Sequence, residues 1–600
     1  MNFFSRYRQW VIAGVLLIHV TVVMYEGYRD APVYDEVAHL ASGISHWKMS
    51  HFALYRANPP LPRMIAALPV IAAGANYDWS RVRHSPGSRC EFSVGRAFVK
   101  ANGTRAFWLY TLGRWAMIPF TILGAWLCLV WGTELFGPNA GLLSLTMWCL
   151  SPTVIANAHL VTPDLPATST GLLAAFAFYR WLKRPCWKFA FFAGAAMGLA
   201  LLTKTTWIIL FGLWPLLGLI QCFRSGQPLK IVSQTTMIVG LGLWILNAGY
   251  AFQGSMAPLG TYDFVSCSLS GREIDNYGLG NKFRGTFMET VPVPLPSDFV
   301  LGVDITKRVF ERRIPNYLRM SLSKDGWWYY YLYCMAVKMP LGILALFVGG
   351  LWCIFRYRDS KRSAFDWLSV FLVPLFLFAF VSSNTGINRH FRYVLPSVPY
   401  VFLVAGVLTT ATQHSRFARG LLATGVTCSA ITLFLAIPHT GSYFNEVAGG
   451  AANGWKHLAS SNIDWGQDLQ RLKEWQDQHP EIETLGLAYY GCIDPSDVGV
   501  NYQMPPTGPL EPRVYPLSSY GPHPGTFAIS VHFLTGAPAF MSNGRGGIKS
   551  IGAKRYIYFR DLKPSETVGS TINIYHLTLE DANELRGQLS LPPIEQEYSR

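Results

Sequence analysis

Long runs of apolar residues, separated by short polar segments, dominate the first 437 residues of the chain. A helix that crosses the hydrocarbon core of a membrane needs about 20 predominantly apolar residues. Eleven stretches approach that length and predict eleven membrane-spanning helices: 10–27, 115–134, 138–157, 167–182, 188–203, 205–222, 231–251, 340–355, 366–383, 394–412 and 419–437. The first stretch could belong to a signal peptide, but no clear small-residue cleavage site follows it, so we expect it to be retained.

Lysine and arginine are distributed unevenly between the two sides of these helices. With the N-terminus in the cytoplasm, the short inside segments hold fourteen Lys and Arg, whereas the short outside segments hold only Lys204, Arg389 and Arg392. Cytoplasmic loops carry such an excess of positive charge. We therefore expect a cytoplasmic N-terminus and an external C-terminus. Three long segments then lie outside: 28–114, 252–339 and 438–600.

The long outer segments have patterns of their own. The apolar stretches 61–74 and 327–337 are too short or too polar-flanked to cross a membrane, and they predict helices lying in its interface. In the tail, 466–478 has helical periodicity. Three further segments read as strands: 484–490, 526–533 and 571–577. The sequence thus predicts a polytopic α-helical membrane domain, residues 1–437, followed by a small extracytoplasmic α/β domain, residues 438–600.

Composition supports this interpretation. Half of the 600 residues are hydrophobic (50%) and only 14% are charged, whereas soluble domains carry about 25% charged residues. These numbers argue against an ordinary soluble enzyme and exclude a disordered chain. The net charge of +15 arises largely from the inside segments and does not indicate a nucleic-acid partner. Ten cysteines without a CxxC pair give no zinc or redox signature, although Cys90 and Cys267 both lie outside and could pair.

Acidic residues in two outer loops are the first candidates for chemistry. Asp35 and Glu36 follow the first predicted helix by about eight residues, and Asp164 lies in a very short outer loop. A carboxylate at the membrane surface can accept a proton from an acceptor hydroxyl or amine. The alternatives are a solvated loop for the Asp35-Glu36 pair and a helix cap for Asp164. The three acids could form one cluster, or hold a divalent cation, but no ligand set demands one.

Basic residues at the outer helix ends are exceptions to the charge bias. Lys204, Lys338, Arg389 and Arg392 all occupy such positions. Each could extend its charge to lipid head groups, or bind phosphate, which arginine grips bidentately and lysine attracts as a point charge. Acids and phosphate-binding cations at one membrane surface suggest a lipid-phosphate-linked donor. Fixed cations would stabilise the leaving phosphate while a carboxylate activates the acceptor, an in-line displacement that inverts the anomeric centre.

At this point the residues match a known family. The chain resembles membrane glycosyltransferases of the GT-C fold, specifically the family 39-like, phospholipid-carrier-dependent group that includes protein O-mannosyltransferases and aminoarabinose transferases. The matching segments, in order, are 35–36, 58–61, 113–114, 163–164, 202–204, 326–330, 337–340 and 391–393. Segments 443–446 and 462–469 are similar to a signature of a bacterial subgroup. The resemblance covers roughly residues 10–470, and it rests on the order and sidedness of the motifs.

The resemblance implies a GT-C-like fold with about eleven transmembrane helices and a polyprenyl-phosphate sugar as donor. It implies an extracytoplasmic acceptor, Asp35 as the base, and Glu36 and Asp164 as supporting acids. Lys204 and Arg392, with Arg389 and Lys338, would bind the carrier phosphate. No metal cofactor is implied. The bacterial subgroup favours an undecaprenyl carrier and the bacterial inner membrane.

Several residues keep two interpretations. His39, Asn58, Asn462, Asp464 and Trp465 could bind the acceptor or the sugar, with tryptophan as a stacking platform. Asn58 departs from the family, where histidine is common, and Asp464 with Trp465 could instead form a helix cap and a packed core. Two other functions remain open: a flippase or transporter of lipid-linked sugars, and an inactive sugar-binding assembly protein. Internal repeats and mid-membrane charges, which transporters often have, are not apparent in the sequence.

Overall fold

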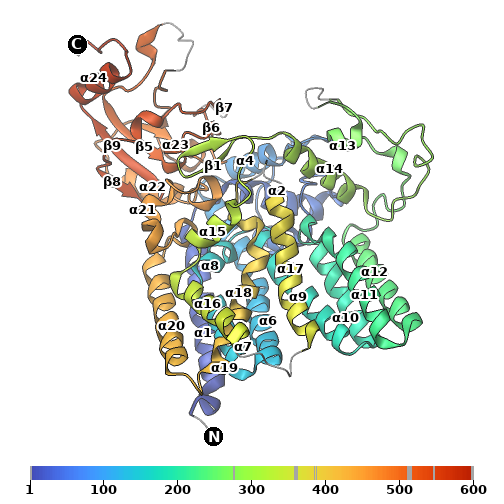
Figure 1. The fold of residues 1–600 in the computed structure, drawn as a ribbon. Coiled ribbons are helices and arrows are strands. Elements are labelled where there is room, and N and C mark those ends of the chain that lie inside the picture. Colours follow the sequence, from blue (N-terminus) through green and yellow to red (C-terminus); the bar gives the residue numbers. More distant parts are fainter. Residues whose placement is uncertain are drawn as a thin grey trace.

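The computed structural model describes residues 3–273, 278–356, 363–383, 386, 388–509, 516–544 and 547–595. Its lower part is a bundle of long helices, and its upper part combines short helices with strands (Figure 1). Helix α1 (Phe3–Arg29) begins at the bottom of the bundle, and α24 (Leu579–Gln588) lies at the top. The first and last helices therefore lie at opposite ends of the molecule.

Each of the eleven apolar stretches contains a helix. After α1 these are α6 (Ile118–Phe136), α7 (Pro138–Leu150) with α8 (Pro152–Ala158), α9 (Asp164–Lys183), α10 (Trp187–Leu201), α11 (Leu210–Ser225), α12 (Pro228–Gly249), α16 (Leu341–Arg356), α17 (Ala364–Ser383), α18 (Val398–Gly406) with α19 (Leu408–Ala411), and α20 (Arg416–Ala436). Within the described residues, six helices are long and apolar enough to cross a membrane, or eight if each of two bent pairs is one span. The chain is a polytopic helical membrane protein, and the number eleven stays a prediction.

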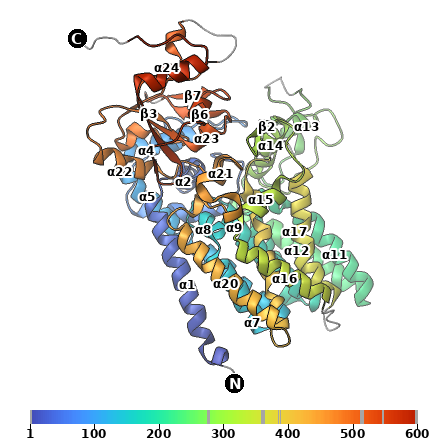
Figure 2. The ribbon, with the colours of Figure 1, turned by 60° about the vertical axis from the view of Figure 1, so that its left-hand side comes forward.

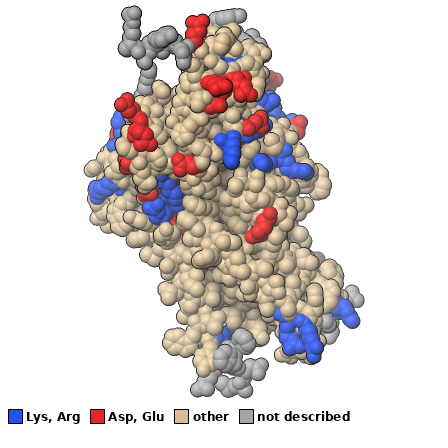
Figure 3. All heavy atoms as spheres, turned by 90° about the vertical axis from the view of Figure 1, so that its left-hand side faces the viewer, with Lys and Arg blue, Asp and Glu red and all other residues tan. Residues whose placement is uncertain are grey.

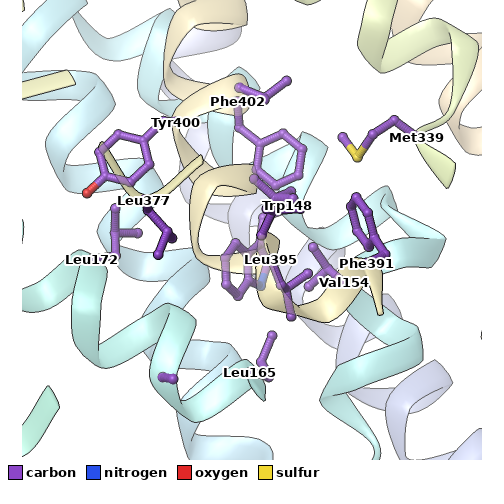
Figure 4. Packing of buried hydrophobic residues seen from close by; sticks show 14 of the residues in the cluster. Trp148, Val154, Leu165, Leu172, Met339, Leu377, Phe391, Leu395, Tyr400 and Phe402 are labelled. Atoms are coloured by element: carbon purple, nitrogen blue, oxygen red, sulfur yellow. The ribbon is translucent and has the colours of Figure 1, made fainter. Parts of the chain in front are cut away.

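The bundle is held by large apolar side chains. Helix α6 packs on α7 and α9, α7 packs on α18, and α10 packs on α12. Trp148, Leu165, Leu395 and Phe402 meet between these helices (Figure 4). Close packing of this kind, rather than exclusion from water, is what joins helices inside a membrane.

The first outer segment folds into four helices. They are α2 (Tyr34–Met49), α3 (Leu61–Ala72), α4 (Glu91–Asn102) and α5 (Arg105–Trp115). Helix α2 is almost entirely buried between α3 and α4. The backbone of α2 lies in direct contact with the backbones of α3 and α4. A Cβ added at Gly43 of α2 would lie 2.0 Å from the carbonyl oxygen of Arg63 in α3, and a Cβ added at Gly95 of α4 would lie 2.0 Å from the carbonyl oxygen of Val37 in α2. The predicted helix 61–74 is confirmed as α3, which buries Ala66, Ala67 and Val70.

The second outer segment is less regular. It contains α13 (Cys267–Ser270), α14 (Ser297–Glu311), the hairpin β1 (Asn316–Leu318) and β2 (Ser321–Ser323), and α15 (Tyr330–Lys338). Helix α15 meets α16 at a bend of 115°. The run of aromatic residues here does not form one belt, because Trp328 is 69% exposed whereas Tyr330 and Tyr331 are buried in the core.

The tail is an α/β unit at the top of the molecule. Its elements are α21 (Gly450–Gly454), α22 (Leu469–Gln478), β3 (Leu485–Ala488), β4 (Tyr502–Gln503), β5 (Gly525–Ser530), α23 (Val531–Leu534), β6 (Ala539–Ser542), β7 (Ile548–Ile551), β8 (Glu566–Val568) and β9 (Ile572–Leu577). A five-stranded sheet has the order β4-β3-β5-β9-β8, with β3 parallel to β4 and β5 and with β9 antiparallel to β5 and β8. The predicted helix is confirmed as α22, and the strands 484–490 and 571–577 are confirmed as β3 and β9. The strand predicted over 526–533 forms β5 only to Ser530, and its last three residues belong to α23.

The α/β unit is bound directly to the top of α1 and α2. The Ala31 amide donates to the Gln467 carbonyl oxygen (2.8 Å), and the Tyr34 amide donates to that of Trp465 (2.9 Å). Arg29, at the end of α1, pairs bidentately with Glu474 of α22. Figure 2 shows α22 above the upper end of α1. The segment that carries Asp35 is therefore held by the α/β unit as well as by the packing of α2 on α3 and α4.

Charge divides one face of the molecule along its long axis. In Figure 3 a broad band over the lower helices is nearly free of charged side chains, Lys and Arg gather at its bottom, and both signs mix over the upper part. Such a band is what a membrane-embedded surface requires, since charges in the hydrocarbon core are costly.

The glycine contacts of α2 give a test of this packing. We expect Gly95→Ala to lower the free energy of unfolding by about 1–3 kcal/mol, since its Cβ would collide with backbone and overpacking costs that much. Gly240→Ala, in α12, is the control. No atom lies within 4 Å of its added Cβ, so we expect a neutral effect or a gain of up to about 1 kcal/mol. Thermal unfolding in detergent measures both, and equal stability of the two variants would contradict the close approach.

Candidate active site

A buried ion pair sets the geometry beneath the candidate site. Glu36 is fully buried in the first turn of α2. Its Oε1 accepts a hydrogen bond from Arg114 Nε (2.9 Å), and its Oε2 accepts one from Arg114 Nη2 (2.5 Å), where Arg114 belongs to α5. The same carboxylate accepts the amides of Val33 (2.9 Å) and Val161 (2.7 Å). Arg114 also donates to the carbonyl oxygens of Gly27, Asp30 and Ala31. Both oxygens of Glu36 are thus occupied, and its geometry is that of a positioning residue rather than of a catalytic acid.

Its neighbour Asp35 points the other way, into a second charge cluster. Asp35 Oδ2 accepts a hydrogen bond from Arg392 Nη2 (2.9 Å), and its side chain is 19% exposed. Arg392 Nη1 also reaches Asp164 Oδ2 (3.5 Å), and Asp164 Oδ1 accepts Lys204 Nζ (2.6 Å). Four residues that the sequence proposed from separate loops are therefore in one chain of contacts, in which two cations neutralise two carboxylates.

The charge on Asp164 is secured by this arrangement. Burial alone would raise the pKa of Asp164, but the Lys204 ammonium and the Arg392 guanidinium outweigh burial and hold the pKa below its ordinary value. Asp164 therefore stays ionised and fixes both cations. Of the two carboxylates in the cluster, Asp35 is the more exposed.

Arg392 is held by the α/β unit. Its guanidinium lies 4.2 Å from the centroid of the Trp465 ring, a cation–π contact. Asn462 fixes the loop before it, because Asn462 Oδ1 accepts the Phe391 amide (2.8 Å) and Asn462 Nδ2 donates to the Arg389 carbonyl oxygen (2.7 Å). Asn462 and Trp465 therefore position the cation, and their predicted contact with a sugar or acceptor stays a prediction.

A pocket opens on the other side of Arg392. It encloses about 540 Å³, counting the space at its mouth, and Arg392, Lys338, Asn462, Trp465 and His159 lie among its walls. Lys338 is buried, and its Nζ donates to the carbonyl oxygens of Asn462 (2.6 Å) and Gly441 (3.4 Å). It has no carboxylate partner in the described part of the chain. Burial lowers the pKa of Lys338 to about 7, so an anionic ligand in the pocket would favour the charged form of Lys338 and be bound by it.

The opposite wall of the pocket holds a charge network that sequence reasoning missed. Asp30, just after α1, lies 3.2 Å from His159 Nε2 and 2.8 Å from Arg471 Nη1. Arg471 also pairs with Asp468 (2.8 Å). Asp30 follows the first apolar stretch more closely than Asp35 does, which was the available signal. Arg471 lies 441 positions away from it along the chain, and no local pattern indicates that contact.

The remaining predicted residues take no part in the chain of hydrogen bonds around Arg392. The His39 and Tyr55 rings lie tilted against each other (4.4 Å between centroids), and burial, together with the charges of Arg63, Arg392 and Lys204, holds the pKa of His39 well below its ordinary value. Asn58 offers its backbone carbonyl oxygen to Arg63. Arg389 donates to the Pro315 carbonyl oxygen. Asp464 is buried and accepts the amides of Gly466 and His532.

The described residues form neither the predicted disulfide nor a metal-ligand cluster. Cys90 and Cys267 are free thiols, so the disulfide considered for them does not form. Cys90 Sγ instead donates to the Arg83 carbonyl oxygen, in a loop of its own. Among the described residues, no group of three His, Cys, Asp or Glu is placed to hold a metal ion.

Comparison with known proteins supports the resemblance seen in the sequence. The family model described as dolichyl-phosphate-mannose-protein mannosyltransferase matches residues 111–240, from α5 to α12. This segment includes Arg114, Asp164 and Lys204, and the match confirms the predicted resemblance there. No curated protein matches the chain.

Several solved structures are similar over much of their length. ArnT from Cupriavidus metallidurans bound to undecaprenyl phosphate has 11% identity and a TM-score of 0.46, over 96% of this chain and 98% of that one. The apo state of the same ArnT has 13% identity and a TM-score of 0.45, over 88% and 94%. The archaeal oligosaccharyltransferase AglB from Archaeoglobus fulgidus, in complex with an inhibitory peptide and a dolichol-phosphate, has 12% identity and a TM-score of 0.42, over 73% and 55%.

The Glu36–Arg114 pair predicts a large loss of stability when one partner is removed. We expect Arg114→Met to lower the free energy of unfolding by about 3–5 kcal/mol, because the Glu36 charge stays buried and unpaired. The control is Arg313→Met. Its pair with Asp325 is exposed (72% and 84%), so its loss should cost less than about 1 kcal/mol. Thermal or denaturant unfolding compares the two, and equal losses would contradict the assigned role.

Asp464 predicts a pH dependence of stability. Burial raises the pKa of Asp464 from 3.8 to about 7 in the folded state. The folded protein therefore holds a proton that the unfolded chain releases, and stability falls as pH rises from about 4 to about 7, by about 1.4 kcal/mol per pH unit. Asp464→Asn removes the titration and keeps an oxygen acceptor for one of the two amides. We expect the melting temperature of wild type, relative to Asp464→Asn, to fall between pH 5 and 7 and to level off above. A constant difference would contradict the assignment.

Proposed function

We propose that the chain is a glycosyltransferase that moves a sugar from a polyprenyl-phosphate carrier to an acceptor at the outer face of the membrane. One observation carries the proposal: Arg392 lines the cation-bearing pocket and at the same time holds Asp35. A site for an anionic leaving group and a carboxylate able to accept a proton therefore share one residue. The family match over residues 111–240 supports the same class of reaction.

The pocket is the proposed site of the carrier phosphate. Lys338, which has no acid partner among the residues described, supplies charge that a phosphate would neutralise. Arg392 adds a second cation, and its Nε is buried without a hydrogen-bond partner in the described structure. As the bond from sugar to phosphate breaks, negative charge grows on the leaving oxygen. Cations already in place stabilise that charge without reorganising.

Asp35 is the proposed base. Its carboxylate would accept the proton of the acceptor hydroxyl or amine while the acceptor atom attacks the anomeric carbon. Attack opposite the leaving phosphate inverts the anomeric centre. Asp164 and Lys204 would act through Arg392, which they hold between the pocket and Asp35. Because protein cations already balance both carboxylates, this scheme requires no metal ion.

The cellular setting belongs to the same proposal. The excess of Lys and Arg in the inside segments supports a cytoplasmic N-terminus and an extracytoplasmic α/β unit. The bacterial-type segments 443–446 and 462–469 favour an undecaprenyl carrier and the bacterial inner membrane. The acceptor would be a protein, a glycolipid or a polysaccharide on that side.

Two substitutions separate the proposed roles. We expect Asp35→Asn to lower kcat about 10²–10⁴-fold with donor binding retained, since only proton transfer is lost. We expect Lys338→Gln to weaken binding of the polyprenyl phosphate about 10–100-fold, the value of a hydrogen bond to a charged group. Transfer from a panel of radiolabelled polyprenyl-phosphate sugars in lipid nanodiscs, with a parallel binding measurement, tests both.

Asp263→Asn is the matched control, because Asp263 is an exposed acid of the second outer segment. It should leave both measurements unchanged. Full transfer by Asp35→Asn would remove Asp35 as the base. Tight carrier binding without turnover on any donor would favour a flippase or an inactive sugar-binding protein.

A further inference from the structure

A second pocket lies away from the candidate active site, where the top of α20 meets the α/β unit. It encloses about 1490 Å³ with its open mouth. Its walls come from α20, from the segment that joins α20 to α22, and from the segments around β8 and β9. None of the candidate catalytic or carrier-binding residues lines it. We call it the α20 pocket.

One side of the α20 pocket continues into an apolar surface. Leu435, at the top of α20, lines the pocket and is 72% exposed. Phe434 beside it is 78% exposed, and Val447 is 82% exposed. Helix α20 is one of the six candidate spans, and only 28% of its apolar window is buried inside the molecule. Exposed apolar side chains on such a helix face lipid, so the pocket borders the membrane at the outer end of a span.

Charged side chains stand among the apolar residues on the other sides of the α20 pocket, and their net charge is positive. Lys456 and Arg560 line it from different segments of the chain, and neither forms an ion pair with a carboxylate in the described ranges. Glu446 is the one acid among its lining residues, and its Oε1 accepts the Thr432 hydroxyl. Tyr443 is only 6% exposed, yet its hydroxyl has no hydrogen-bond partner within the part of the chain described. A pocket that combines an unpaired buried hydroxyl with two cations on its walls is suited to a phosphate or hydroxyl group of a ligand.

We infer that the α20 pocket binds the head group of an anionic membrane lipid, whose acyl chains lie along the exposed face of α20. Lys456 and Arg560 would neutralise the lipid phosphate, and the Tyr443 hydroxyl would donate to its oxygens or to a head-group hydroxyl. This assignment does not depend on the glycosyltransferase proposal, since it concerns binding alone.

The site would also support the donor pocket, because one wall separates the two. The Phe444 ring faces the α20 pocket and lies 4.5 Å from Lys338 Nζ. Ser442 in the same wall accepts Gln467 Nε2 (3.0 Å) on one side and the Ser570 hydroxyl (2.7 Å) on the other. A bound head group would therefore order segment 441–444, on which Lys338 rests.

The test measures lipid binding to the full-length protein in detergent by native mass spectrometry. The probes are phosphatidylglycerol, phosphatidylcholine and polyprenyl phosphate. We expect wild type to retain phosphatidylglycerol in preference to phosphatidylcholine, and the double variant Lys456→Gln, Arg560→Gln to bind it at least tenfold more weakly. The charge-matched control, Lys549→Gln with Lys554→Gln, removes two exposed lysines of the same unit and should stay within twofold of wild type.

Location is tested separately, so that a folding defect cannot decide the result. A phosphatidylglycerol with a photoreactive head group should cross-link wild type within segments 439–456 and 560–575, and Tyr443→Phe should reduce that yield. Cross-links elsewhere, equal retention of both phospholipids, or equal binding by the pocket and control variants would overturn the inference. Preferential binding of polyprenyl phosphate at these segments would also overturn it, and would make the pocket part of the carrier path.

Discussion

The structure above the membrane depends on one buried charge pair. Removing Glu36 and Arg114 from water is costly, and the cost is offset only because every polar atom of the two groups that the structure describes has a partner. Those partners come from the end of α1, the start of α2, helix α5 and the loop before α9. A pair that joins four segments fixes the direction of the first turn of α2. The orientation of Asp35, one residue before Glu36, follows from it.

Adjacent carboxylates therefore have different tasks. Successive residues of a helix point about 100° apart, so Glu36 turns into the protein while Asp35 turns toward Arg392 and remains partly exposed. In the second cluster the two cations, Lys204 and Arg392, neutralise the two carboxylates, Asp164 and Asp35. Lys338 is left outside that balance, on the pocket side of Arg392. The charges around Arg392 cancel, whereas Lys338 has no acid partner in the described structure. This difference gives the site an acid side at Asp35 and a proposed phosphate side at Lys338.

Much of this could be predicted from sequence, for identifiable reasons. Apolar length predicts the membrane helices, and sidedness of charge places Asp35, Asp164, Lys204 and Arg392 on one surface without any knowledge of their contacts. The family resemblance assigns different roles to Asp35 and Glu36, but the residue pattern alone gives no physical reason, because the difference arises from Arg114, 78 positions away from Glu36. Nor does the sequence predict that Asn462 and Trp465 support Arg392, since these contacts join distant loops.

The α/β unit completes the site rather than standing apart from it. Trp465 stacks on Arg392, Asn462 fixes the loop before Arg392 and accepts Lys338 through its carbonyl oxygen, and Arg471 joins the network around Asp30. The cations of the helical bundle are thus oriented by residues that follow the last membrane helix. Segment 441–444 lies between that helix and these supports, with one pocket on each side. Lys338 contacts this segment at the Gly441 carbonyl oxygen and at the Phe444 ring. A shift of the α/β unit relative to α20 would move these contacts, so the position of the unit and the affinity of the phosphate pocket are physically linked.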